Sequence, residues 1–219
     1  GQSISRQGVW NVVQKLGSQI EARENRYIEL NKEHKLQGEK EVAILFEEAD
    51  GIFVKKQKRY RHKGSNSFEL KIAIAHEGWK ETAPKRFELA NKTVVCDIAG
   101  GTEFNKRKEA VLSSKYNTDE ISLRIFNSDG GRWIRKLHDY NDEVQFQLDP
   151  FHIQKAIRGS DPGGDYSIQV SKMLKAYSFD DLFEYLDAVA NSLESKNAEE
   201  RVRRLLSYLR DNRKGLIPY

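Results

Sequence analysis

Five strand-like segments, and the way they are connected, constrain the fold of this chain most. The segments cover residues 42–54, 68–79, 92–100, 120–130 and 143–150, and they are rich in branched or aromatic residues. The first three follow one another without a helix, whereas helical patterns over 102–116 and 131–140 precede the fourth and the fifth. This order predicts a mixed sheet: three antiparallel strands, then strands that helices join in parallel.

Helical patterns also flank the strand region. Residues 3 to about 36 read as a helix: apolar residues recur at three- and four-residue steps from Val9 to Ile20, and after Gly17 the pattern thins into a very polar stretch, a solvent-bridging helix or a linker. Three amphipathic helices follow within 161–219. The order of elements is that of the ribonuclease H-like (retroviral integrase-like) fold, an α/β mixed sheet with flanking helices. We therefore expect an N-terminal helix and linker over 1–38, the core over 39–160 and a helical insertion over 161–219. A fold alone is weak evidence for function.

Composition narrows the class of protein. Of the 219 residues, 38% are hydrophobic and 32% charged, which is typical of a soluble globular protein. No apolar stretch approaches the roughly 20 residues that cross a bilayer, and no signal-peptide pattern opens the chain. The single cysteine, Cys96, excludes an intrachain disulfide. We expect a protein of the reducing cytoplasm, without a membrane partner, in which Cys96 is a buried strand residue.

Two basic runs indicate where a nucleic acid could bind. The net charge is only +4, but "KKQKRYRHKG" (55–64) and "RVRRLLSYLRDNRK" (201–214) concentrate cations around tyrosines. The candidate DNA-binding residues are Lys55, Lys56, Lys58, Arg59, Arg61 and Lys63. The alternative is a solvated hairpin tip and a charged helix face. The stretch "SISRQGVWNVVQKL" also resembles the second helix of a helix-turn-helix, whose Ser, Arg and Gln face the DNA groove.

Two strands run up to an Asp-Gly pair, in "AILFEEADGIFV" (43–54) and "LRIFNSDGGRWI" (123–134). In the expected fold the first and fourth strands are neighbours, so Asp50 and Asp129 would converge. Nucleases and transposases of this fold hold two divalent ions roughly 4 Å apart on hard oxygen ligands. We predict that Asp50 and Asp129 are the catalytic acids of a two-metal site for Mg²⁺ or Mn²⁺. The alternative is ordinary turn chemistry, although the apolar "IFV" after Asp50 favours a strand carboxylate that needs a partner.

Further polar residues accompany these acids. Asp149 and His152 lie in "QLDPFH", where the fifth strand meets a helix that opens at Pro150. They are candidates for accessory roles at the site, or else a helix cap and a core histidine. Glu48 shares a face of the first strand with Asp50, as an outer ligand or as a solvated residue.

Together these segments resemble the ISLre2 family of bacterial insertion-sequence transposases, a DDE group related to Mutator-like and IS256-type enzymes. The resemblance rests on "FEEADG", "NSDGGRWI" and "QLDPFH", and extends to "ISRQGVWNVVQKL", "ELKIAIAHEGW", "NKTVV" and "LLSYLRDNRKGLIPY". It implies metal-dependent cleavage and joining of DNA ends by a homo-oligomer in the transpososome. By position, Asp50 matches the first catalytic acid and Asp129 the second, while Asp149 and His152 match a D-x-x-H signature that helps to hold DNA or the active site.

The same resemblance implies a third acid that this chain lacks. In the family, a Glu on a helix beyond a stretch like "GLIPY" completes the site, and this chain ends at Tyr219. We therefore expect a fragment that folds and binds metal weakly. The glutamates of the last helices are expected to be exposed and to form salt bridges: Glu184, Glu194, Glu199 and Glu200. Two other classes remain open, a non-catalytic DNA-binding or assembly module and a ribonuclease H-like nuclease.

Overall fold

The computed structural model describes residues 4–57, 66–131, 133–134 and 144–216. The chain divides into two compact units. One comprises Gly1–Leu45 and Gly51–Leu123, and the other comprises Phe46–Asp50 and Arg124–Tyr219, so the first strand contributes residues to both.

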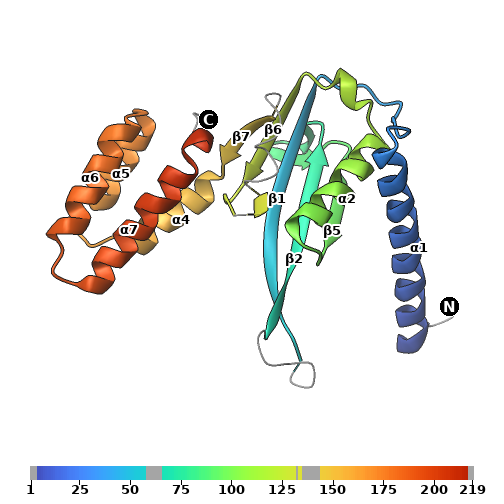
Figure 1. The fold of residues 1–219 in the computed structure, drawn as a ribbon, viewed down its shortest axis with the longest axis horizontal. Coiled ribbons are helices and arrows are strands. Elements are labelled where there is room, and N and C mark those ends of the chain that lie inside the picture. Colours follow the sequence, from blue (N-terminus) through green and yellow to red (C-terminus); the bar gives the residue numbers. More distant parts are fainter. Residues whose placement is uncertain (1–3, 58–65, 132, 135–143, 217–219) are drawn as a thin grey trace. The chain divides into compact units, whose positions relative to one another are not determined.

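The elements follow the predicted order (Figure 1). The helices are α1 (Arg6–Lys32), α2 (Gly101–Ser113), α4 (Pro150–Ser160), α5 (Tyr166–Lys175), α6 (Phe179–Ser192) and α7 (Lys196–Asp211), with 3₁₀ helices η2 (Thr118–Glu120) and η3 (Arg213–Gly215). The strands are β1 (Ile44–Lys55), β2 (Ser67–His76), β3 (Trp79–Ala83), β4 (Arg86–Leu89), β5 (Thr93–Asp97), β6 (Leu123–Ser128) and β7 (Val144–Leu148). Each of the five predicted strand segments contains a strand, and the mixed α/β class is confirmed. Of the helix expected over 131–140, only residues 133–134 are described as helical.

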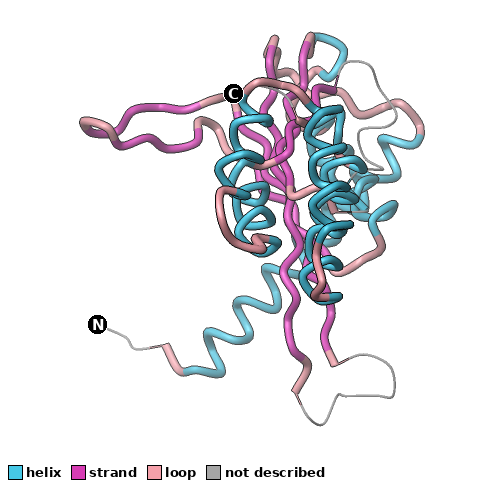
Figure 2. The backbone as a smooth tube through the Cα atoms, turned by 90° about the vertical axis from the view of Figure 1, so that its left-hand side faces the viewer, coloured by secondary structure: helices cyan, strands magenta, loops and turns pink. Residues whose placement is uncertain are grey.

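Five strands form one sheet in the order β5-β2-β1-β6-β7. β2 and β5 pair antiparallel. The N–H of Lys56, just after β1, donates to the carbonyl of Asn66, just before β2, at 2.8 Å. β1 and β2 are therefore the two arms of a hairpin, and they lie side by side in both views (Figure 2).

The other half of the sheet is parallel. β6 and β7 pair in parallel, with Phe126 opposite Phe146. The N–H groups of Ser122 and Leu123 both donate to the carbonyl of Ala43, at 3.0 and 3.1 Å. Because Ala43 precedes β1 and Leu123 opens β6, these two strands start at the same end of the sheet and run in the same direction. The predicted mixed sheet is confirmed.

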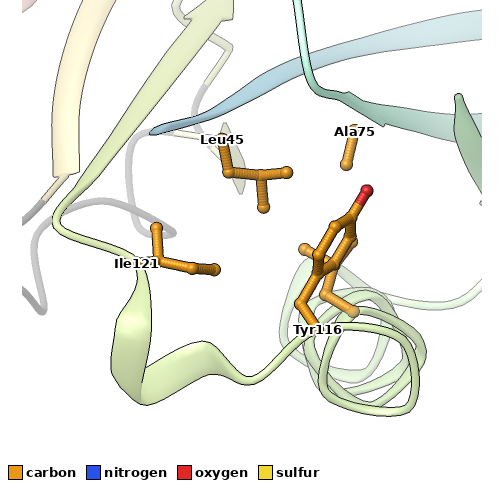
Figure 3. Close-up of a cluster of buried hydrophobic side chains, with 5 residues drawn as sticks. Leu45, Ala75, Tyr116 and Ile121 are labelled. Carbon is orange, nitrogen blue, oxygen red and sulfur yellow. The ribbon is translucent and has the colours of Figure 1, made fainter. Parts of the chain in front are cut away.

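The first unit has a small core between β1, β2 and α2. Its buried members are Leu45, Ala75, Leu112, Tyr116 and Ile121 (Figure 3). Buried residues alternate with less buried ones along β1 from Leu45 to Asp50, as the twofold period of a strand requires. The largest of these side chains, Tyr116, is completely buried, so its hydroxyl needs a partner inside the protein.

That partner is Glu77. The Tyr116 hydroxyl donates to Glu77 Oε1 at 2.9 Å, and the Lys40 ammonium lies 2.6 Å from the same oxygen. The Asn91 amide donates to Glu77 Oε2 at 2.6 Å. Partial burial raises the pKa of Glu77, but the three hydrogen bonds outweigh it and hold that pKa below its ordinary value. Burial, together with the bond to Glu77, raises the pKa of Tyr116.

Replacing Tyr116 with Phe is expected to destabilise the protein at neutral pH by about 1.5–3 kcal/mol, the range for a hydrogen bond to a charged group. The folded state lowers the pKa of Glu77, so the ionised carboxylate stabilises the protein at pH values above its unfolded-state pKa near 4.5. This stabilisation is lost as the pH falls through the folded-state pKa of Glu77. Urea unfolding of both proteins at about pH 7 and about pH 3 checks this. A difference in unfolding free energy that is as large in acid as at neutral pH would contradict it.

The second unit has a helical core of its own, in which α5, α6 and α7 lie side by side (Figure 1). Apolar residues at three- and four-residue spacing supply the contact faces, as the amphipathic pattern predicts. The most completely buried are Val170, Leu182, Leu186, Val202 and Leu209.

Two details differ from the sequence predictions. A two-stranded hairpin, β3–β4, follows β2 and was not predicted; it forms a sheet of its own, and the tube in Figure 2 shows it apart from the five-stranded sheet. Cys96 was predicted to be buried and is exposed. β5 is the outermost strand, and its alternation turns Val95 (2% exposed) into the core and Cys96 away from it.

Candidate functional site

Asp50 and Asp129 lie on neighbouring strands of the second unit. Asp50 is inside β1, and Asp129 is the first residue after β6. β1 and β6 start side by side at Ala43 and Ser122, and each aspartate comes seven residues later. At about 3.3 Å per residue in a parallel sheet, with strands about 4.8 Å apart, the two backbones reach the same height next to each other.

A tight turn holds the Asp129 carboxylate. Asp129 Oδ1 accepts a hydrogen bond from the Gly131 N–H at 2.9 Å, and the Ser128 hydroxyl accepts one from the Gly130 N–H at 3.1 Å. Gly130 has φ of +77°, a conformation that favours glycine. The turn chemistry considered as the alternative is therefore present, and it also orients the carboxylate. Since a carboxylate offers about four lone-pair sites, this bond leaves capacity for a metal ligand.

Asp149 follows β7 as Asp129 follows β6, and these two strands are paired. Ser128 and Leu148 are partners in the parallel register of β6 and β7, and each is followed directly by an aspartate. The Asp149 N–H donates to the Ser128 carbonyl at 2.9 Å, which extends the ladder by one residue. The carboxyl ends of β6 and β7 thus deliver two acids side by side.

The side chain of Asp149 serves the helix that follows. Its Oδ1 accepts a hydrogen bond from the Phe151 N–H at 2.9 Å and caps α4. Its Oδ2 lies 2.8 Å from His152 Nδ1. The predicted cap is confirmed, but His152 is not a core residue, because 29% of its side chain is exposed. If Nδ1 carries the proton toward Asp149, Nε2 of the neutral ring is an acceptor.

Asp50 is exposed, on the face of β1 opposite the buried residues Leu45 and Ala49. Glu48 is half-buried on the same face as Asp50, as its spacing predicts. At the next position, a Cβ on Gly51 would collide with the Glu69 side chain, so only glycine fits there without a shift.

Sequence reasoning missed a buried ion pair close to these acids. Glu47, in β1, is 2% exposed, and Arg124 Nε on the adjacent β6 donates to its carboxylate. The signal was available, because Glu47 lies between Leu45 and Ala49 on the inward face of an alternating strand. A charge at such a position requires a partner.

The donor atoms suit a hard divalent cation. Asp50, Asp129 and Asp149 come from three neighbouring strands, and carboxylate oxygens are ligands that suit Mg²⁺ or Mn²⁺. Within the described ranges, no three or more His, Cys, Asp or Glu side chains converge as a metal-binding group. The described residues therefore supply only part of a metal site, in which Asp50 and Asp129 are the candidate ligands. The four glutamates expected to be exposed lie on or beside α6 and α7; three are exposed, and Glu199 is half-buried and pairs with Arg203.

Only part of the predicted DNA-binding set falls within the structure. Lys55 is exposed at the end of β1, and Lys56 follows it in the hairpin. The other four candidates lie outside the described residues: Lys58, Arg59, Arg61 and Lys63. The stretch that resembles a helix-turn-helix forms the start of α1, where Ser5 caps the helix by accepting a hydrogen bond from the Gly8 N–H.

Comparison with known proteins assigns a family. The model of the uncharacterised protein family UPF0236 matches residues 1–219. The chain belongs to UPF0236. No curated protein and no solved structure matches this UPF0236 chain. None of its described helices combines the length and apolar character needed to cross a bilayer.

Proposed function

We propose that this UPF0236 chain is the catalytic region of a DDE-type transposase, which cleaves and joins DNA with Mg²⁺ or Mn²⁺. The observation that carries the proposal is that Asp50 and Asp129 each come seven residues after the point where β1 and β6 start side by side, and that Asp149 directly follows Leu148, the partner of Ser128. The mixed sheet of order β5-β2-β1-β6-β7 is what the proposed ribonuclease H-like fold requires, and it supports the same proposal.

In the proposed mechanism, Asp50 and Asp129 hold the metal ions through their carboxylates. When bound, two divalent ions supply activation of a water or 3′-hydroxyl and stabilisation of the leaving oxygen. Gly130 and Gly131 form the turn after Asp129, in which the Gly131 N–H orients the carboxylate. Asp149 holds His152 through Nδ1, which leaves Nε2 for an accessory contact. A hydroxyl nucleophile attacks the phosphodiester directly, so no covalent protein intermediate is needed.

The wider assembly is part of the same proposal. The partners are transposon ends and target DNA, the working form is a homo-oligomer, and the compartment is the cytoplasm. A third acidic ligand is supplied from outside the described residues, as in the family that the sequence resembles.

Manganese binding tests the proposal directly. We expect the 219-residue chain to bind Mn²⁺ weakly, and Asp50→Asn/Asp129→Asn to lose this binding, because the amide is a poor ligand for a hard cation. Calorimetry and Mn²⁺ electron paramagnetic resonance measure it, with Asp119→Asn, an exposed aspartate in η2, as the matched control. Equal binding by the double variant and the wild type would refute the assignment of these two ligands.

One observation favours a second candidate, a non-catalytic DNA-binding or assembly module. α1 has 27 residues and none is buried, and Val9, Val13 and Leu16 expose more than half of their surface on one face. A helix with an apolar stripe left open is typical of an element that meets a partner. Metal-dependent cleavage separates the transposase from this module, and joining of a 3′-hydroxyl end to target DNA separates it from a nuclease of the same fold.

A further inference from the structure

We propose that Tyr208 and Asn212, at the end of α7, are positioning residues that hold the loop carrying Asp129. This inference rests on the proposed function, since it concerns the same metal ligand. The Tyr208 hydroxyl donates a hydrogen bond to the backbone carbonyl of Asp129 at 3.0 Å, across 79 positions of sequence. Both residues belong to the second unit.

The two bonds at Asp129 act on opposite ends of the residue. Tyr208 holds its carbonyl, while the Gly131 N–H holds Oδ1 of its carboxylate. With both ends fixed, the carboxylate loses rotational freedom before any metal arrives. Ligands held in this way bind metal more tightly, because outer partners fix their orientation.

Asn212 adds a packing contact to the same loop. It is 3% exposed, and its Nδ2 donates to the Tyr208 carbonyl at 2.8 Å. Its amide lies against Gly130: a Cβ built on that glycine would collide with Oδ1 and would come within 2.7 Å of Cγ and 2.8 Å of Nδ2. The positive φ of Gly130 and this close approach together require glycine after Asp129.

The amide of Asn212 has a further property that points to function. Its Oδ1 is buried without a hydrogen-bond partner in the part of the chain that the structure describes. A buried acceptor without a hydrogen bond lowers the stability of the fold. Such a loss of stability is expected at functional sites, where the position of a side chain is needed for function.

The 3₁₀ helix η3, which follows α7, contacts β7. Gly215 in η3 lies against the Phe146 ring, and a Cβ there would come within 3.0 Å of the Leu148 nitrogen. Residues 208–215 therefore contact Asp129 and Gly130, just after β6, and the end of β7, just before Asp149. The helical region predicted as an insertion thus supports the proposed site through its last turn.

Tyr208→Phe tests the inference, because it removes one hydroxyl and leaves the ring. We expect Mn²⁺ affinity to fall roughly tenfold, the lower end of the range for outer-shell partners, and the Gly130 and Gly131 amides to exchange hydrogen faster. Tyr177→Phe, an exposed tyrosine after α5, is the control and should change neither quantity. Asn212→Ala is a second variant, with the same expected direction in both measurements.

The outcomes separate the two proposals. Wild-type affinity and wild-type exchange in Tyr208→Phe would overturn the positioning role. If the wild-type chain binds no Mn²⁺, the proposed function fails, and amide exchange alone decides the role of Tyr208: faster exchange at Gly131 supports it, and unchanged exchange refutes it.

Discussion

Replacing Asp129 with Asn is expected to abolish DNA cleavage while leaving the fold and DNA binding intact. Asn matches Asp in shape, and its amide oxygen can still accept the hydrogen bond from Gly131 that closes the turn. The anionic oxygen that a divalent cation requires is lost. Asp50→Asn should act in the same way. We expect the cleavage rate to fall by at least about a thousandfold, about 4 kcal/mol in the activation barrier.

Nicking of labelled transposon-end DNA by the wild-type protein and by each variant, in Mg²⁺ and in Mn²⁺, measures this effect. Fluorescence anisotropy on the same DNA shows whether binding survives. Asp119→Asn, which changes an exposed aspartate in η2, should retain full activity. Cleavage within about tenfold of the wild type in either active-site variant (less than about 1.4 kcal/mol) would rule out the two-metal assignment.

Removing the partner of the buried glutamate is expected to have the largest effect on stability. The side chain of Glu47 is 1% exposed, and Arg124 Nε donates to it from the neighbouring strand. Arg124→Met leaves this carboxylate inside the protein without that cation. Breaking a buried pair in this way typically costs about 3–5 kcal/mol. Guanidinium unfolding at neutral pH should show a loss of this size.

Two further variants identify the cause. Glu47→Leu/Arg124→Met removes both charges and should recover most of the lost unfolding free energy, since an apolar pair of similar volume can replace a buried ion pair. Arg203→Met breaks an exposed pair with Glu199 and should leave stability nearly unchanged. If Arg124→Met and Arg203→Met lower the unfolding free energy by equally small amounts, the burial of Glu47 does not make its pair with Arg124 important for stability.

Some features of the site are encoded locally and could be read without a structure. The Asp-Gly pair after β6 forms its turn through bonds between residues two apart, and Asp149 caps α4 through the same short range. The strands containing Asp50 and Asp129 follow from the twofold alternation of apolar residues, and their order along the chain favoured them as neighbours.

Other local predictions failed for an identifiable reason. Cys96 was assigned to the core because it lies in an apolar strand, but the strand is outermost in the sheet and that face is exposed. The β3–β4 hairpin was missed because its residues are exposed on both strands, so no apolar alternation marks them. Periodicity reports which side chains share a face, not which face is covered.

The sequence by itself determined the five strands of the main sheet, most of the helices and the positions of the three aspartates in or directly after strands, because these depend on residues a few positions apart. Only the tertiary structure decided that Arg124 neutralises Glu47, 77 positions away, and that Tyr208 holds Asp129 from a helix 79 positions later. Such contacts depend on how distant elements pack. No period or short motif encodes them, because each partner is chosen by the surface that the fold brings to it.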